Sequence, residues 1–114
     1  MDLRRLAEDV ETISSRYAAH YEIERDDAWY LLKLQEEVGE LTQAYLMRNG
    51  QARAKGRSAE DLEAGFRAEM ADVLCQLLLM AQHHGVDIED EVDRKWLHRL
   101  RSRPEHSDVP PPKW

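Results

Sequence analysis

The chain has 114 residues, a length that suits one compact domain. Charged residues make up 34% of it and hydrophobic residues 42%, with only five glycines and four prolines, a composition that favours helices over strands. Its formal net charge of −7 excludes a broad basic face, so long nucleic acid is not expected as a partner.

Neither a secretory signal nor a membrane span is expected. The N-terminal residues MDLRRLAEDVETI lack a continuous apolar core, and no run approaches the roughly 18 apolar residues that cross a bilayer. The only cysteine, Cys75, cannot form an intrachain disulfide, which fits a reducing compartment, and is expected to be a small core side chain. The sequence therefore predicts a soluble, cytoplasmic protein with no membrane partner.

Apolar residues recur every three or four positions in four segments, the spacing of one helical face. The first helix is expected from about residue 2 to 20. The second begins at Asp26 or Asp27, either of which can cap its first turn, and its apolar stripe runs from Leu31 to Tyr45. The segment RNGQARAKGRSAED, residues 48–61, interrupts this period with two glycines and is expected to be a loop.

The third helix is expected to start after Ser58 and to be ended by Gly85, and its centre, VLCQLLLM, is apolar almost all round. Asp87 is expected to cap a fourth helix whose apolar positions run from Ile88 to Leu100. Together these elements predict an all-α fold, a four-to-five-helix antiparallel bundle over residues 1–102 with a proline-rich tail at 103–114. The all-round apolar third helix further implies that helices pack across a dimer interface.

Two predicted helices carry acidic pairs next to their apolar stripes. At about 100° per residue, Glu37 and Glu40 lie about 60° and 120° from Leu34, with Lys33 between them in angle, whereas Glu36 points mostly outward.

The third helix carries the matching pair, because Glu69 lies inside its apolar stripe and Asp72 about 60° to one side. Four unpaired carboxylates at one interface are strongly unfavourable without protons, basic partners or a metal. An oxygen-only ligand set favours Mg²⁺, with Mn²⁺ as a possible substitute, and Mg²⁺ takes its remaining ligands from waters and phosphates. A polyphosphate substrate is therefore expected.

Two other interpretations of the acidic residues compete with a magnesium site. Glu37 and Glu40 can be surface acids that pair with Lys33 or with arginines, as exposed helices often arrange. A di-iron carboxylate bundle normally uses Glu-x-x-His on two helices, and no glutamate in this chain has a histidine three residues after it.

The motifs EEVGE and EMAD, with 28 residues between Glu40 and Glu69, resemble the EExxE…ExxD signature of the MazG-like nucleotide pyrophosphohydrolases. The likeness covers roughly residues 26 to 97. It implies a helical fold, dimeric or a dimer of dimers, that converts a nucleoside triphosphate to the monophosphate and pyrophosphate with Mg²⁺, in nucleotide-pool house-cleaning. By the same resemblance, the metal ligands are Glu37, Glu40, Glu69 and Asp72, and Glu36 supports them.

The resemblance also implies substrate-binding residues. Lys95 matches a lysine that many relatives use near the phosphates, but Arg99 stands where relatives commonly have asparagine, which puts contacts at that end in doubt. Trp29 precedes the acidic motif where relatives place an aromatic that stacks on a base, and a core or interface tryptophan is the alternative. Lys33, which lies between Glu37 and Glu40 in angle, is a further substrate-binding candidate, and His83 and His84 stay outside the metal set.

The basic residues of the loop can fold over a triphosphate like a lid or simply remain solvated. They are Arg48, Arg53, Lys55 and Arg57. The expected mechanism is metal-assisted phosphoanhydride hydrolysis in which Glu36 or a ligand carboxylate accepts the proton of the attacking water. The alternatives are a non-catalytic helical regulatory or interaction module and a phosphoribosyl-ATP pyrophosphohydrolase.

Overall fold

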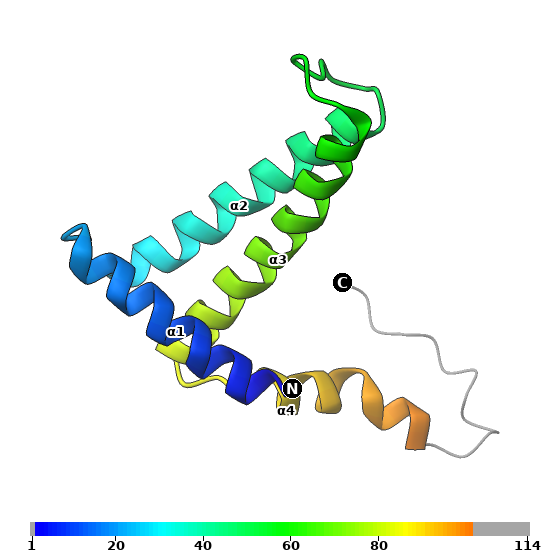
Figure 1. Ribbon diagram of the computed structural model, residues 1–114. Coiled ribbons are helices and arrows are strands. Elements are labelled where there is room, and N and C mark those ends of the chain that lie inside the picture. Colours follow the sequence, from blue (N-terminus) through cyan, green and yellow to red (C-terminus); the bar gives the residue numbers. More distant parts are fainter. Residues whose placement is uncertain (1, 102–114) are drawn as a thin grey trace.

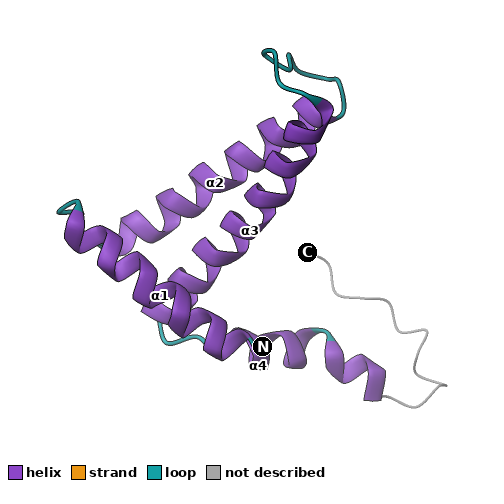
Figure 2. Ribbon diagram, viewed as in Figure 1, coloured by secondary structure: helices purple, strands orange, loops and turns teal. Residues whose placement is uncertain are grey.

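The computed structural model describes residues 2–101, and the tail expected at 103–114 lies outside the described residues. The elements are α1 (Leu3–His20), α2 (Asp27–Arg48), α3 (Ala59–His83), α4 (Ile88–Lys95) and the 3₁₀ helix η1 (Leu97–Arg101). No strand occurs within residues 2–101, so the predicted all-α class is confirmed (Figure 2). None of these described helices is long and apolar enough to cross a bilayer.

Short polar side chains start the helices, as the sequence predicts for three of them. The side chains of Asp26, Ser58 and Asp87 each accept a hydrogen bond from the backbone N–H three residues later, at 2.8–3.1 Å. Asp2 does the same for α1 at 2.7 Å. After α3, Gly85 adopts a φ of 67°, the left-handed conformation with which helices commonly end.

Helices α2 and α3 form a long antiparallel hairpin, and α1 crosses it near the end of α3 (Figure 1). The buried apolar side chains of residues 2–101 gather mainly at this crossing: Ala7, Ala18, Tyr30, Met47, Leu78, Leu79 and Ala81. Cys75, expected in the core, is only half-buried. The hairpin therefore has its firmest packing toward the C-terminal end of α3.

Arg25, in the α1–α2 connection, fastens α1 to the start of α2. Its two terminal nitrogens donate to both carboxylate oxygens of Glu11 at 2.8 Å, and its guanidinium lies 5.9 Å from the ring centre of Trp29 and 5.7 Å from that of Tyr30. The bidentate pair holds the pKa of the Glu11 carboxyl below its usual value.

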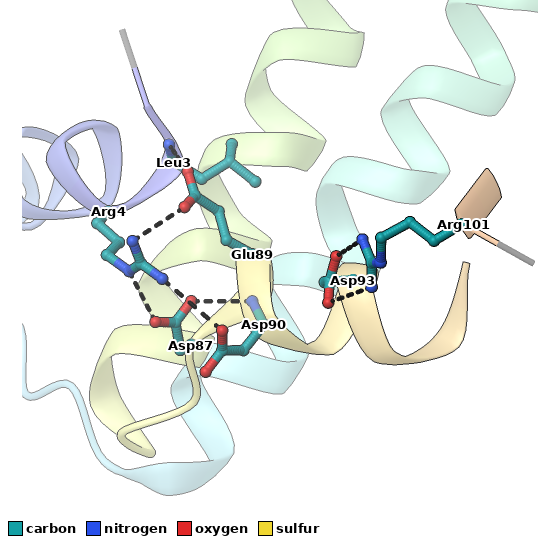
Figure 3. Close-up of polar contacts among 7 residues, drawn as sticks. All are labelled: Leu3, Arg4, Asp87, Glu89, Asp90, Asp93 and Arg101. Atoms are coloured by element: carbon teal, nitrogen blue, oxygen red, sulfur yellow. Dashed lines mark hydrogen bonds and ion pairs between the residues drawn. The ribbon is translucent and has the colours of Figure 1, made fainter. Parts of the chain in front are cut away.

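Helix α4 packs mainly against α1 and extends away from the hairpin (Figure 1). Arg4 reaches Asp87 at 2.7 Å, Glu89 at 3.2 Å and Asp90 at 3.8 Å, and the backbone N–H of Leu3 donates to Glu89 at 2.8 Å (Figure 3). The single chain therefore has the predicted antiparallel pairing in α2 and α3 but not a closed four-helix bundle.

The fourth helix is also shorter than predicted. It ends at Lys95, and the chain tightens into η1, where the N–H of Arg99 bonds to the carbonyl of Trp96 at 3.2 Å. Arg101 then folds back to make a two-pronged ion pair with Asp93 at 2.8 and 3.0 Å (Figure 3). The predicted stripe from Ile88 to Leu100 is therefore divided between two helix types.

Candidate metal centre

The antiparallel hairpin brings three of the four predicted ligands together. Glu37 and Glu40 lie in the middle of α2, opposite Glu69 in α3, and one carboxylate oxygen from each lies within 4.8 Å of the others. Asp72, one turn after Glu69, is close enough for its charge to act on both Glu37 and Glu69. The separation of the two motifs along the chain thus becomes proximity across one helix pair.

Burial and mutual repulsion change the proton affinity of this cluster. Burial, followed by the charges of Glu40 and Asp72, raises the pKa of Glu37 to about 7. The same causes, burial first, raise the pKa of Glu69 above its ordinary value. The metal-free cluster is therefore under electrostatic stress near neutral pH, and a cation would relieve it.

No basic side chain neutralises the cluster. Within residues 2–101, Glu37, Glu40, Glu69 and Asp72 form no ion pair with lysine, arginine or histidine. Glu37 Oε2 and Glu69 Oε2 are buried and make no hydrogen bond to any described residue. Buried oxygens of this kind need a partner. The donor set is all oxygen, which fits a hard divalent cation such as Mg²⁺.

Glu36 and Lys33 pair with each other on the same helix. Glu36 is exposed, and its carboxylate lies 3.3 Å from Lys33 Nζ. The predicted pairing of Glu37 and Glu40 with Lys33 or arginines is therefore absent among residues 2–101, since the lysine pairs with Glu36, although Glu40 is exposed as that interpretation expects.

Trp29 lies two turns before Glu37, near the start of α2. It is half-buried, packs edge-on against Tyr30 with ring centres 5.0 Å apart, and has the Arg25 guanidinium over its ring. The indole of Trp29 is therefore packed against Tyr30 and Arg25 at the N-terminal end of α2.

Lys95 and Arg99 are not brought to the carboxylates by the single chain. Lys95 ends α4 and Arg99 lies in η1, and Figure 1 shows these elements running away from the α2–α3 hairpin. Both predicted substrate contacts therefore lie apart from the acidic cluster in one copy.

A cavity of about 370 Å³ adjoins the cluster on the side of the α2–α3 loop. Its acidic wall contains Glu40 and Glu69, and the loop contributes Lys55 and Arg57. The sequence shows that this loop is basic, but it does not show which of its basic residues lie near the acids.

One contact at the opposite end of the hairpin escaped the sequence reasoning. His83 Nε2 lies 2.6 Å from Asp27 Oδ1, and the His83 ring stacks on Tyr30 with ring centres 4.2 Å apart. The histidine lowers the pKa of the Asp27 carboxyl. The sequence did contain a sign of this contact, because in an antiparallel pair of helices of similar length the start of α2 lies opposite the end of α3.

Comparison with known proteins adds a family assignment. The model of the MazG nucleotide pyrophosphohydrolase domain matches residues 25–107, well over half of the chain. The match includes both acidic motifs, the loop between them, and α4. No curated protein and no solved structure shows significant similarity to the chain.

Proposed function

The chain belongs to the MazG nucleotide pyrophosphohydrolase family, and from this premise we propose that it converts a nucleoside triphosphate to the monophosphate and pyrophosphate. One observation carries the proposal: three carboxylates converge within 4.8 Å from facing helices, without a basic partner among residues 2–101. Nucleotide-pool house-cleaning is the corresponding cellular role.

Glu37, Glu40, Glu69 and Asp72 hold the divalent cation in this proposal. Mg²⁺ is the preferred ion and Mn²⁺ a possible substitute, because both take carboxylate oxygen. When bound, the ion supplies Lewis-acid chemistry by offsetting charge on phosphate oxygens and activating water. The two helices contribute a rigid ligand set whose repulsion without metal favours binding.

The chain's other polar residues handle the proton and the substrate. Glu36 accepts the proton of the attacking water in this proposal, and its carboxylate lies 3.3 Å from Lys33 Nζ. Lys33 contacts the substrate from the same helix, and Trp29 offers a ring on which a base can stack.

Lys95 and Arg99 take part only if a second copy of the chain supplies them, and we propose a homodimer or a dimer of dimers. Helix α4 extends away from its own hairpin, while α3 leaves an uncovered row of Met70, Leu74 and Leu77 that are 45%, 42% and 39% exposed. Such a row along the helix carrying Glu69 supports packing against another hairpin. Residues 1–102 form the single domain that assembles in this way.

The test is pyrophosphate release from a panel of canonical and damaged nucleoside triphosphates, with and without Mg²⁺. We expect Mg²⁺-dependent release from at least one of them, and Glu69→Gln should lower kcat/KM by about 100-fold or more because a group acting on transition-state charge is lost. Glu60→Gln, an exposed acid on the same helix, is the matched control and should retain full activity.

The stability of the variant separates loss of chemistry from loss of fold. Glu69→Gln removes one of several mutually repelling carboxylates, so its metal-free Tm should not fall below that of the wild type. Near-normal hydrolysis by Glu69→Gln would contradict the site. No release from any nucleotide and no thermal shift with Mg²⁺ would instead support a non-catalytic interaction module.

A further inference from the structure

The cavity beside the metal centre has walls of opposite charge. Glu40 and Glu69 line it from α2 and α3, and Lys55 and Arg57 line it from the connecting loop. The remaining wall is small or apolar, with Ala44, Met47 and Gly65 next to Gln43. A cavity of about 370 Å³ with this arrangement suits a compact anion that also contacts a cation on the acidic side.

A tight turn sets the backbone that carries the two cations. Lys55 and Gly56 have φ values of 56° and 79°, and the N–H of Arg57 bonds to the carbonyl of Ala54 at 3.1 Å. Positive φ at both central residues is the pattern of a type I′ turn, in which glycine, asparagine or aspartate normally occupies the place of Lys55. A lysine held in the left-handed region is a strained choice of the kind that gathers at functional sites.

The base of the loop is anchored to α2. The backbone N–H groups of Gln51 and Ala52 both donate to the carbonyl of Leu46, at 2.8 and 3.2 Å. Since α2 also carries Glu40, the turn and the acidic wall are attached to the same rigid helix. The backbone that carries Lys55 and Arg57 therefore has a defined position relative to the metal centre.

The basic residues in and around the loop divide into two groups. Arg48 is used structurally, since it pairs with Glu63 and lies 4.9 Å above the ring centre of Phe66. Lys55 and Arg57, by contrast, form no ion pair within residues 2–101, although two carboxylates line the same cavity. Their charges are thus available to a ligand.

We propose that Lys55 and Arg57 form a diphosphate subsite, which binds the pyrophosphate portion of the substrate between the loop and the cation on the carboxylates. This assignment rests on the proposed function. A guanidinium offers paired donors to phosphate oxygens, and an ammonium offers a compact charge. Arg53 belongs to the same loop but does not line the cavity, so it is outside the subsite.

The subsite gives the substrate a direction along α2. The loop follows the C-terminal end of this helix, Glu37 and Glu40 lie near its middle, and Trp29 lies near its start, eleven residues before Glu40. At about 1.5 Å per residue, Trp29 is about 16 Å from Glu40 along the axis. The leaving pyrophosphate thus points toward the loop, and the nucleoside toward Lys33 and Trp29.

The experiment measures binding of inorganic pyrophosphate to the full chain by titration calorimetry in the presence of Mg²⁺. Lys55→Gln and Arg57→Gln remove the charge but keep a long polar side chain, and each should weaken binding by about tenfold, the effect of one lost charged hydrogen bond. Arg53→Gln is the matched control and should bind as the wild type does. With a triphosphate substrate, the two variants should raise KM more than they lower kcat.

Additional measurements separate this subsite from the metal centre and from the proposed function. The thermal shift produced by Mg²⁺ alone should survive in the Lys55→Gln, Arg57→Gln double variant, and it should be reduced in Glu69→Gln. Unchanged pyrophosphate affinity in the double variant would overturn the subsite even if the wild type hydrolyses triphosphates. Pyrophosphate binding that the wild type shows and the double variant loses, in a protein that hydrolyses no nucleotide, would support the subsite and overturn the proposed function.

Discussion

Glu36 and Glu37 are adjacent in the chain but occupy different environments. Glu36 is exposed and contacts Lys33, whereas Glu37 Oε2 is buried without a hydrogen bond to any described residue. A step of one residue turns the side chain by about 100° around the helix, which is enough to move a carboxylate from solvent to the α2–α3 contact. Of the two, only Glu37 therefore lies where it can meet a carboxylate of α3.

The raised pKa of Glu37 predicts a pH-dependent stability of the metal-free protein. The carboxyl titrates near 4.5 when unfolded and at about 7 when folded, so between these values the folded state binds more protons. The free energy of unfolding contributed by this group therefore falls as pH rises from about 4.5 to about 7. Thermal denaturation in chelator should show this decline in the wild type and a weaker one in Glu37→Gln.

The informative quantity is the difference between wild type and Glu37→Gln in how Tm changes with pH. Glu11 and Asp27, present in both proteins, have lowered pKa values and change the stability in the opposite direction at lower pH. Glu36→Gln serves as the control and should follow the wild type. Added Mg²⁺ should raise Tm more at pH 7 than at pH 5. Identical pH profiles for wild type and Glu37→Gln would contradict the buried, repelling environment of Glu37.

Helical geometry alone placed Glu37 and Glu40 on one flank of their helix and Glu69 inside the apolar stripe of the next, because these angles depend only on residue spacing. Lys55 and Arg57 were beyond the same reasoning, since the path of a loop depends on its turns. The decisive feature, a lysine with positive φ, runs against the residue preference of that turn type.

At the scale of elements, α4 depends on its neighbours. It has only eight residues, and isolated helices shorter than about 12–15 residues are marginal in water. Its N-terminal turn is held by the Asp87 cap and by Arg4, which lowers the pKa of Asp87 through its hydrogen bond. The position of α4, and with it that of Lys95, is thus maintained by α1.

Arg4→Gln should loosen α4 without unfolding the hairpin. We expect amide hydrogen exchange to become a few-fold faster in residues 88–95 and to stay unchanged in the centre of α3. The reason is that the acidic partners of Arg4 all lie at the start of α4, as Figure 3 shows. Arg5→Gln, whose partner Asp9 belongs to the same helix, is the control. Equal exchange rates in the two variants would show that Arg4 does not position α4.

The starts of the helices were predictable and the end of α4 was not. Asp26, Ser58 and Asp87 act as caps through bonds within three residues, which the sequence displays directly. The end of α4 involves Arg101 returning to Asp93, eight residues earlier, a contact that a repeating apolar pattern does not encode. For the same reason the attachment of α4 to α1 could not be foreseen.

On the scale of the whole molecule, one copy is more open than a compact domain of its size. Its radius of gyration is 17.8 Å, whereas a compact domain of about 100 residues has about 13 Å. Apolar side chains on both hairpin helices remain exposed, including Leu31, Val38 and Tyr45 of α2, which recur every seven residues. Seven-residue spacing is typical of helices that pack lengthwise against another helix. The proposed second copy would cover these rows and supply Lys95 and Arg99.

Charges on the uncovered row of α3 should break this assembly. Leu74→Glu together with Leu77→Glu places two charges on the uncovered row of α3, where burial without a partner would be costly. We expect light scattering to show an oligomer for the wild type and a monomer for the double variant. Triphosphate hydrolysis should then fall by about 100-fold or more, because charged groups acting on the phosphates are lost.

Ala68→Glu adds a charge to the same helix at an exposed position about 180° from Leu77, so it should leave the oligomer intact. Circular dichroism must show retained helix in the double variant, since the α2–α3 core at Leu78 and Leu79 is untouched. Full activity in a helical monomer would mean that one copy suffices and that Lys95 and Arg99 are not contributed in trans. Loss of activity with the oligomer intact would instead place Leu74 and Leu77 in the site itself.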